Sequence, residues 1–176
     1  MRLFVGLWPP PPVLDAVARL RHPDHAGLRW TTREQWHVTL RFLGEVDAHD
    51  LPALTQQLEE GLAGHPAVEV TLGPAVEWLG GRRQGVLVVP TTGAAGLSKA
   101  VVEGTSGFGG PPEPRPFRGH LTLARVRRGH PAPAGLAGEL IRATWRAEGV
   151  AVVRSHLEPS GARYETMAEV ALARGI

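Results

Sequence analysis

The chain has 176 residues, which fits one domain or two small lobes that share a core. It contains no cysteine, which excludes disulfides, thiolate nucleophiles and cysteine-ligated metal centres. The net charge is only +2 and the basic residues are nearly all arginine; guanidinium suits phosphate contacts, but this composition alone does not indicate nucleic-acid binding.

Apolar periodicity predicts alternating strands and helices in the first half of the chain. Pro12 and Pro52 stand where a helix tolerates proline, in its first turn. Thr31 or Thr32 is placed to cap a turn before the strand predicted over residues 37–43. The predicted elements are a strand over residues 2–7, a helix over 13–20, strands over 28–30 and 37–43, and a helix over 50–62.

The second half continues in the same way. The predicted elements are strands over residues 68–72, 76–79 and 86–89, a helix over 97–102, a strand over 120–126, a helix over 136–144, and two strands over 150–157 and 164–173 that form a hairpin. A loop rich in glycine and proline, residues 104–119, leads into the strand at 120–126.

Strand, helix and strand recur in both halves. We therefore expect an α+β fold in a single domain, residues 1–176, built as two pseudo-twofold-related lobes of largely antiparallel sheet. The helices would lie outside, and the two lobes would flank a central cleft. No stretch approaches the roughly 20 apolar residues that span a membrane, so a soluble, cytoplasmic monomer is expected.

One short string occurs twice, once in each half. The copies are His37-Val38-Thr39-Leu40 and His120-Leu121-Thr122-Leu123. Side chains two apart on a strand share a face, so each copy presents an imidazole and a hydroxyl together, with its apolar residues toward a core. The alternative is a pair of buried strand histidines, each satisfied by a backbone carbonyl.

The segments His37-Val-Thr-Leu-Arg-Phe-Leu-Gly44 and His120-Leu-Thr-Leu-Ala-Arg125 resemble the paired H-x-T-x motifs of the 2H phosphoesterases. The group most similar is the RNA 2′,3′-cyclic phosphodiesterases, also called 2′-5′ RNA ligases. The resemblance covers nearly the whole chain, since residues 2–7 are similar to that group's first strand and Gly161-Ala-Arg-Tyr164 to its C-terminal turn.

This resemblance implies hydrolysis of an RNA 2′,3′-cyclic phosphate to a 2′-phosphate, without metal or cofactor. His37 is then the proton donor and His120 the proton acceptor, although a nearly symmetric site leaves their order open from sequence. Thr39 and Thr122 would donate to the phosphoryl oxygens. With a 5′-hydroxyl in place of water, the same chemistry gives 2′-5′ ligation.

Two arginines are candidates for the same site. Arg125 matches the family's arginine after the second motif and is predicted to contact phosphate or RNA. Its offset of five from His120 puts it on the wrong face of a straight strand unless a bulge or the end of the strand redirects it. Arg41, four residues after His37, is predicted to lie at the rim of the cleft, and the alternative is a plain solvated side chain.

The remaining histidines show no H-E-x-x-H spacing, and no acidic third ligand stands near the two motif histidines in sequence, so no metal site is expected. The expected partner is RNA with a 2′,3′-cyclic end, tRNA fragments being one candidate. Two alternatives remain: a cyclic phosphodiesterase acting on a small nucleotide or ADP-ribose derivative, and a non-catalytic protein that binds RNA ends.

Overall fold

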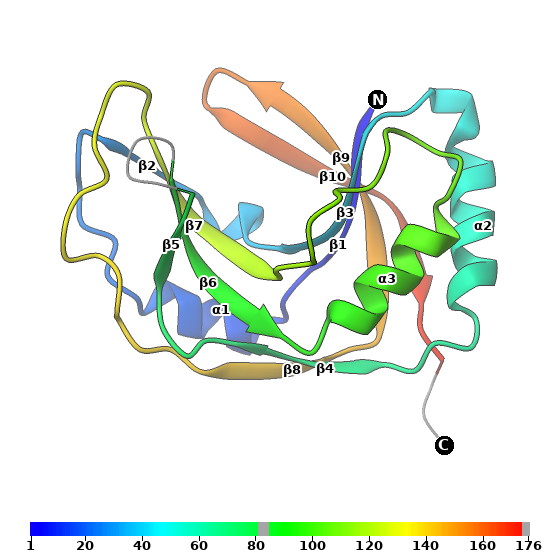
Figure 1. Ribbon diagram of the computed structural model, residues 1–176, viewed down its shortest axis with the longest axis horizontal. Helices are drawn as coiled ribbons and strands as arrows, with labels where there is room; N and C mark the ends of the chain where they lie inside the picture. The colour runs from blue at the N-terminus through cyan, green and yellow to red at the C-terminus, as the bar shows by residue number, and fades with distance from the viewer. Residues whose placement is uncertain (81–84, 174–176) are drawn as a thin grey trace.

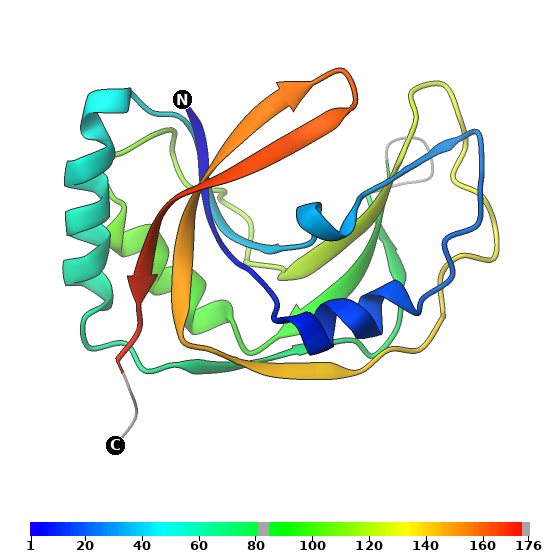
Figure 2. The ribbon, with the colours of Figure 1, turned by 180° about the vertical axis from the view of Figure 1, so that it is seen from behind.

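The computed structural model describes residues 1–80 and 85–173 and has the expected α+β architecture (Figures 1 and 2). The helices are α1 (Pro11–Ala18), α2 (Leu51–Leu62) and α3 (Ala95–Gly104), with short 3-10 turns η1 (Arg33–Gln35) and η2 (Ala48–Asp50). The strands are β1 (Arg2–Leu7), β2 (Leu28–Trp30), β3 (Val38–Glu45), β4 (Val68–Leu72), β5 (Glu77–Leu79), β6 (Val86–Thr92), β7 (His120–Val126), β8 (Ala143–Ala147), β9 (Gly149–Glu158) and β10 (Gly161–Ala171).

The strands form one long, curled path of antiparallel pairs. Its order is β10-β9-β1-β3-β7-β6-β4-β8, with β2 beside β7 and β5 beside β6. Helices α2 and α3 pack against each other at one end of the molecule, where α2 meets β10 and α3 meets β3 (Figure 1). The β9–β10 hairpin rises away from this end and overhangs the middle of the sheet (Figure 2).

The predicted apolar stripes form the core. On α2, the apolar spacing predicts a buried stripe of Leu51, Leu54, Leu58 and Leu62; the last three are fully buried and Leu51 is half-buried. On β6, the residues from Leu87 to Val89 are buried, as expected for a strand covered on both faces. None of the helices in the described ranges has the length and apolar character that crossing a bilayer would require.

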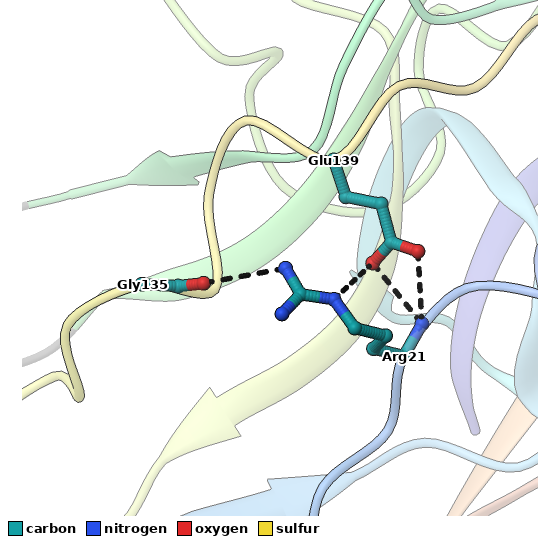
Figure 3. A network of polar contacts seen from close by, with 3 residues as sticks. All are labelled: Arg21, Gly135 and Glu139. Carbon is teal, nitrogen blue, oxygen red and sulfur yellow. Dashed lines mark hydrogen bonds and ion pairs between the residues drawn. The ribbon is translucent and has the colours of Figure 1, made fainter.

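The helix predicted over residues 136–144 is wrong. Gly135 and Gly138 adopt positive φ angles of 81° and 95°, which ends any helical run there, and the chain then enters β8 along β4. The carboxylate of Glu139 accepts hydrogen bonds from the backbone N–H of Arg21, at 3.1 and 3.3 Å, and from its Nε (Figure 3). Long-range contacts therefore override the local apolar pattern of this segment.

Candidate active site

The two motif strands, β3 and β7, cross at the centre of the sheet. Within the described residues they are paired at one position, Val38 opposite Leu121, and both of these side chains are fully buried. Extending this antiparallel register by one residue places His37 opposite Thr122 and Thr39 opposite His120. All four polar side chains line one cleft of about 470 Å³. The structure thus brings both motifs together, as predicted.

Both histidines are held by the same local bond. The Nδ1 of His37 lies 2.6 Å from the carbonyl oxygen of Gln35, and the Nδ1 of His120 lies 2.8 Å from that of Arg118. A carbonyl only accepts hydrogen bonds, so each Nδ1 carries a proton and each Nε2 is the nitrogen available for acid–base chemistry. The Thr39 hydroxyl lies 3.1 Å from the Nε2 of His37.

His37 sits in an aromatic enclosure. Its ring stacks on Phe4 with centroids 4.7 Å apart and meets the edges of Tyr164 and Trp8 at 4.9 and 5.6 Å. Burial lowers the pKa of His37 from 6.5 to about 4; the bond to Gln35 opposes this, while the charges of Arg125 and His120 add to it. In the free protein His37 is therefore neutral at pH 7.

Arg125 reaches the cleft through a bulge in β7. Thr122 is opposite Val88 and Ala124 is opposite Leu87, so Leu123 is an extra residue, and both Leu123 and Ala124 are buried. Arg125 then emerges on the same face as His120 and lines the cleft. Of the two possibilities that the sequence left open, a bulge or the end of the strand, the structure shows the bulge.

Thr31 stabilises this bulge. Its hydroxyl lies 2.8 Å from the carbonyl oxygens of both Thr122 and Leu123, and its backbone N–H donates to the Leu123 carbonyl at 2.8 Å. The hydroxyl also accepts a bond of 3.0 Å from the indole of Trp36, which is buried in the core.

The prediction that Arg41 lies at the cleft rim is wrong. A second bulge occurs in β3, where Val5 is opposite Arg41 and Gly6 is opposite Thr39, so Leu40 is the extra residue. Arg41 is consequently turned to the opposite side of the sheet and buried, with 6% of its surface exposed. Phe42, five residues after His37, lines the cleft instead.

On that side the guanidinium of Arg41 fastens the C-terminal end of α3 and the loop beyond it to β3. It donates to carbonyl oxygens and to one hydroxyl, those of Val102, Thr105, Phe108 and Gly110. Its role is therefore structural.

Several residues of the cleft were not predicted from the sequence. Gln35 joins three parts of the site: its backbone carbonyl orients His37, its side chain accepts from the Thr32 N–H at 2.9 Å, and its amide donates to the Ala162 carbonyl at 2.6 Å. The spacing Thr32-x-x-Gln35 is a capping-box pattern that could have signalled this. The cleft also contains Arg2, Phe4 and Tyr164, which lie in segments that resemble the family but were not predicted as site residues, and Arg29, which lies in no motif.

The tip of the β9–β10 hairpin closes one side of the cleft. Gly161 adopts a φ of +131°, a region that favours glycine, and a Cβ added there would lie 3.8 Å from the Cζ of Arg29. Burial raises the pKa of the Tyr164 hydroxyl, whereas the charges of Arg125, Arg2 and Arg29 lower it. The phenol is therefore protonated at pH 7.

Within residues 1–80 and 85–173, one group of side chains has the spacing of metal ligands. It consists of Asp47, His49 and Asp50 at the surface turn η2, outside the cleft.

The chain matches a known protein family over most of its length. Residues 9–159 match the 2'-5' RNA ligase superfamily. The chain belongs to that superfamily. Within it, an "RNA 2',3'-cyclic phosphodiesterase" from Thermus thermophilus is 32% identical, over 98% of this chain and 90% of that protein. A protein of the same name from Archaeoglobus fulgidus is 28% identical, over 77% of this chain and 78% of its own length.

Two solved structures have a similar fold. The crystal structure of the protein TT0787 from Thermus thermophilus superposes with a TM-score of 0.77 at 27% identity and covers 98% of both chains. E. coli LigT, solved in complex with NADP+, gives a TM-score of 0.71 at 24% identity over 97% of this chain and 96% of LigT. The likeness to LigT establishes the shared fold.

Proposed function

We propose that this chain is an RNA 2′,3′-cyclic phosphodiesterase that produces 2′-phosphate ends. The observation that supports the proposal is that β3 and β7 cross at Val38 and Leu121, and that the side chains of His37, Thr39, His120 and Thr122 line the same cleft. A relative named for this activity is 32% identical over 98% of this chain. A histidine pair of this kind supplies the acid and the base that opening a cyclic phosphate ester needs.

The proposed reaction is one in-line displacement. A water oxygen attacks phosphorus and gives its proton to the Nε2 of His120, while the bond from phosphorus to the ribose O3′ breaks and O3′ takes a proton from the Nε2 of His37. Thr39 and Thr122 donate hydrogen bonds to the non-bridging oxygens as their charge grows. Arg125 adds a fixed positive charge on the same face. Replacing water by an RNA 5′-hydroxyl would form a 2′-5′ linkage.

The neutral state of His37 in the free protein bears on its role as donor. A phosphate anion against its Nε2 favours the imidazolium, so His37 would take up its proton together with the substrate. Raising its pKa from about 4 to 7 requires about 4 kcal/mol of interaction with the anion. The reverse order of roles, with His37 as base, needs no such uptake, and experiment has to separate the two.

The test is product analysis on a short oligoribonucleotide that ends in a 2′,3′-cyclic phosphate, in the presence of EDTA. We expect conversion to a 2′-phosphate end at an undiminished rate, because proton transfer and hydrogen bonding take the part of a Lewis acid. Binding without conversion would indicate an RNA-end binding protein. Loss of turnover on chelation, restored by zinc or manganese, would indicate a metallophosphoesterase.

We also infer an internal duplication of two lobes around the β3–β7 crossing. Two matched features support it. Each motif histidine bonds the carbonyl two residues before it, and each motif strand has a bulge that turns the fifth residue after the histidine into the cleft, Phe42 in one strand and Arg125 in the other.

A further inference from the structure

We propose that the RNA chain upstream of the cyclic end leaves the catalytic cleft over Arg125 and continues across a basic surface formed by Arg125, Arg128 and His130. This inference rests on the proposed function and names the form of its substrate, an oligonucleotide. The surface flanks the turn that follows β7, at the left of Figure 1.

The two ends of the cleft differ in chemistry, which gives the substrate a direction. Because β3 and β7 are antiparallel where they cross, Phe42 and Arg125 lie in opposite directions from the histidine pair. The Phe42 end also contains Arg2, whose guanidinium lies 4.8 Å from the Phe42 ring centroid. Apolar and aromatic surface suits a base, whereas a phosphodiester backbone requires cations.

The cations at the other end are free to bind an anion. Arg29 and Arg125 are direct cross-strand partners on β2 and β7, and like charges in that position repel. Within the described residues, neither guanidinium makes an ion pair or hydrogen bond with the protein, and nor does that of Arg128. Within the described residues, five other arginines are ion-paired with carboxylates, namely Arg21, Arg33, Arg115, Arg118 and Arg163, so not every exposed arginine is available to an anion.

Arg125 connects the catalytic cleft to a second, open hollow. Its side chain lines both, and among the described residues that line the second hollow there is no carboxylate. Arg128 and His130 are exposed on a turn that is held in place by two backbone bonds: the N–H of Arg127 donates to Gly27 at 2.8 Å, and that of His130 donates to Arg127 at 3.1 Å. A backbone phosphate that lies beyond Arg125, on the side away from the histidine pair, therefore meets a second cation, the guanidinium of Arg128.

The experiment compares two substrates that share the reacting group, a nucleoside 2′,3′-cyclic phosphate and a short oligoribonucleotide with the same cyclic end. Arg128→Gln should lower kcat/KM for the oligonucleotide about five-fold, the effect of one exposed ion pair, and leave turnover of the mononucleotide unchanged. The slope of log(kcat/KM) against log salt for the oligonucleotide should become shallower by about 0.7, the share of one phosphate contact in a single strand.

Two controls accompany it. Arg146→Gln removes the same charge from β8, at the far edge of the sheet, and should change neither substrate. Arg128→Lys should restore most of the oligonucleotide activity, because the contact is mainly one of charge. Equal effects of Arg128→Gln and Arg146→Gln on the oligonucleotide, or an equal loss on both substrates, would overturn the proposal.

Failure of the proposed function is distinguishable from failure of this surface. If the wild-type protein turns over neither substrate, the proposed function is wrong. Binding of a fluorescently labelled oligonucleotide that ends in a 2′-phosphate would then still test the surface. Weaker binding by Arg128→Gln than by Arg146→Gln, with the shallower salt slope, would support the surface; identical binding curves would refute it.

Discussion

Replacing the two motif histidines one at a time separates the proton donor from the acceptor. On the RNA substrate, His37→Ala and His120→Ala should each lower turnover by about 100- to 10,000-fold, the usual effect of one positioned acid or base. On a nitrophenyl phosphodiester of a nucleotide, whose leaving group departs without a proton, His37→Ala should recover most of this loss. His120→Ala should not recover, because the attacking water still lacks its base.

The lowered pKa of His37 is the reason that an assay with an activated leaving group is needed. With a pKa of about 4, only about one in a thousand His37 side chains is protonated at pH 7 in the free protein. A pH profile cannot assign the roles, because an interacting pair titrates with macroscopic pKa values that belong to the pair. A change of leaving group, in contrast, alters only the requirement for the proton donor.

His49→Ala serves as the matched control, since His49 is exposed on η2 outside the cleft, and it should leave both rates unchanged. If His120→Ala is the variant that recovers on the activated ester, the roles of donor and acceptor are reversed. If neither single variant loses activity on RNA, catalysis by the histidine pair is refuted.

Three further predictions follow from the geometry. Thr39→Val and Thr122→Val should each cost up to about 2–4 kcal/mol of transition-state stabilisation, measured as kcat/KM, and unchanged rates would exclude them as donors to the phosphoryl oxygens. Between pH 6.5 and 4 the unfolded chain binds the His37 proton more readily than the folded protein, so the free energy of unfolding should fall by about 3 kcal/mol as the pH drops through this window. Urea unfolding should show that His37→Gln flattens this fall while His49→Gln does not; equal slopes would show that His37 is not desolvated. Arg41→Met should lower the free energy of unfolding by on the order of 3 kcal/mol, because it leaves buried acceptors around α3 without a donor, whereas Arg146→Met should have little effect.

The central part of the site could be predicted from sequence because it depends on local rules. Alternation along a strand puts His37 with Thr39 and His120 with Thr122, and the buried partners Val38 and Leu121 fix which face they take. The offset of Arg125 was enough to predict that a bulge or the end of the strand must redirect it, and the structure shows a bulge in β7.

What could not be predicted depends on partners distant in sequence. Nothing local to β3 indicates its bulge, which arises in the pairing with β1 around Gly6, where an added Cβ would lie 2.9 Å from the Val38 carbonyl oxygen. Because of this bulge, Phe42 lines the cleft and Arg41 does not. The segment at 136–144 has a helical apolar pattern, yet its later residues pair with β4, more than 70 residues earlier in the chain.

The claim that both histidines serve one displacement is tested most directly by the double variant His37→Ala/His120→Ala, compared with the two single variants on the cyclic-phosphate oligonucleotide. Groups that act as a unit are strongly non-additive, so the double variant should be about as slow as the poorer single variant. If the two losses multiply instead, the histidines act independently, and the account of a single acid–base pair at the β3–β7 crossing is contradicted.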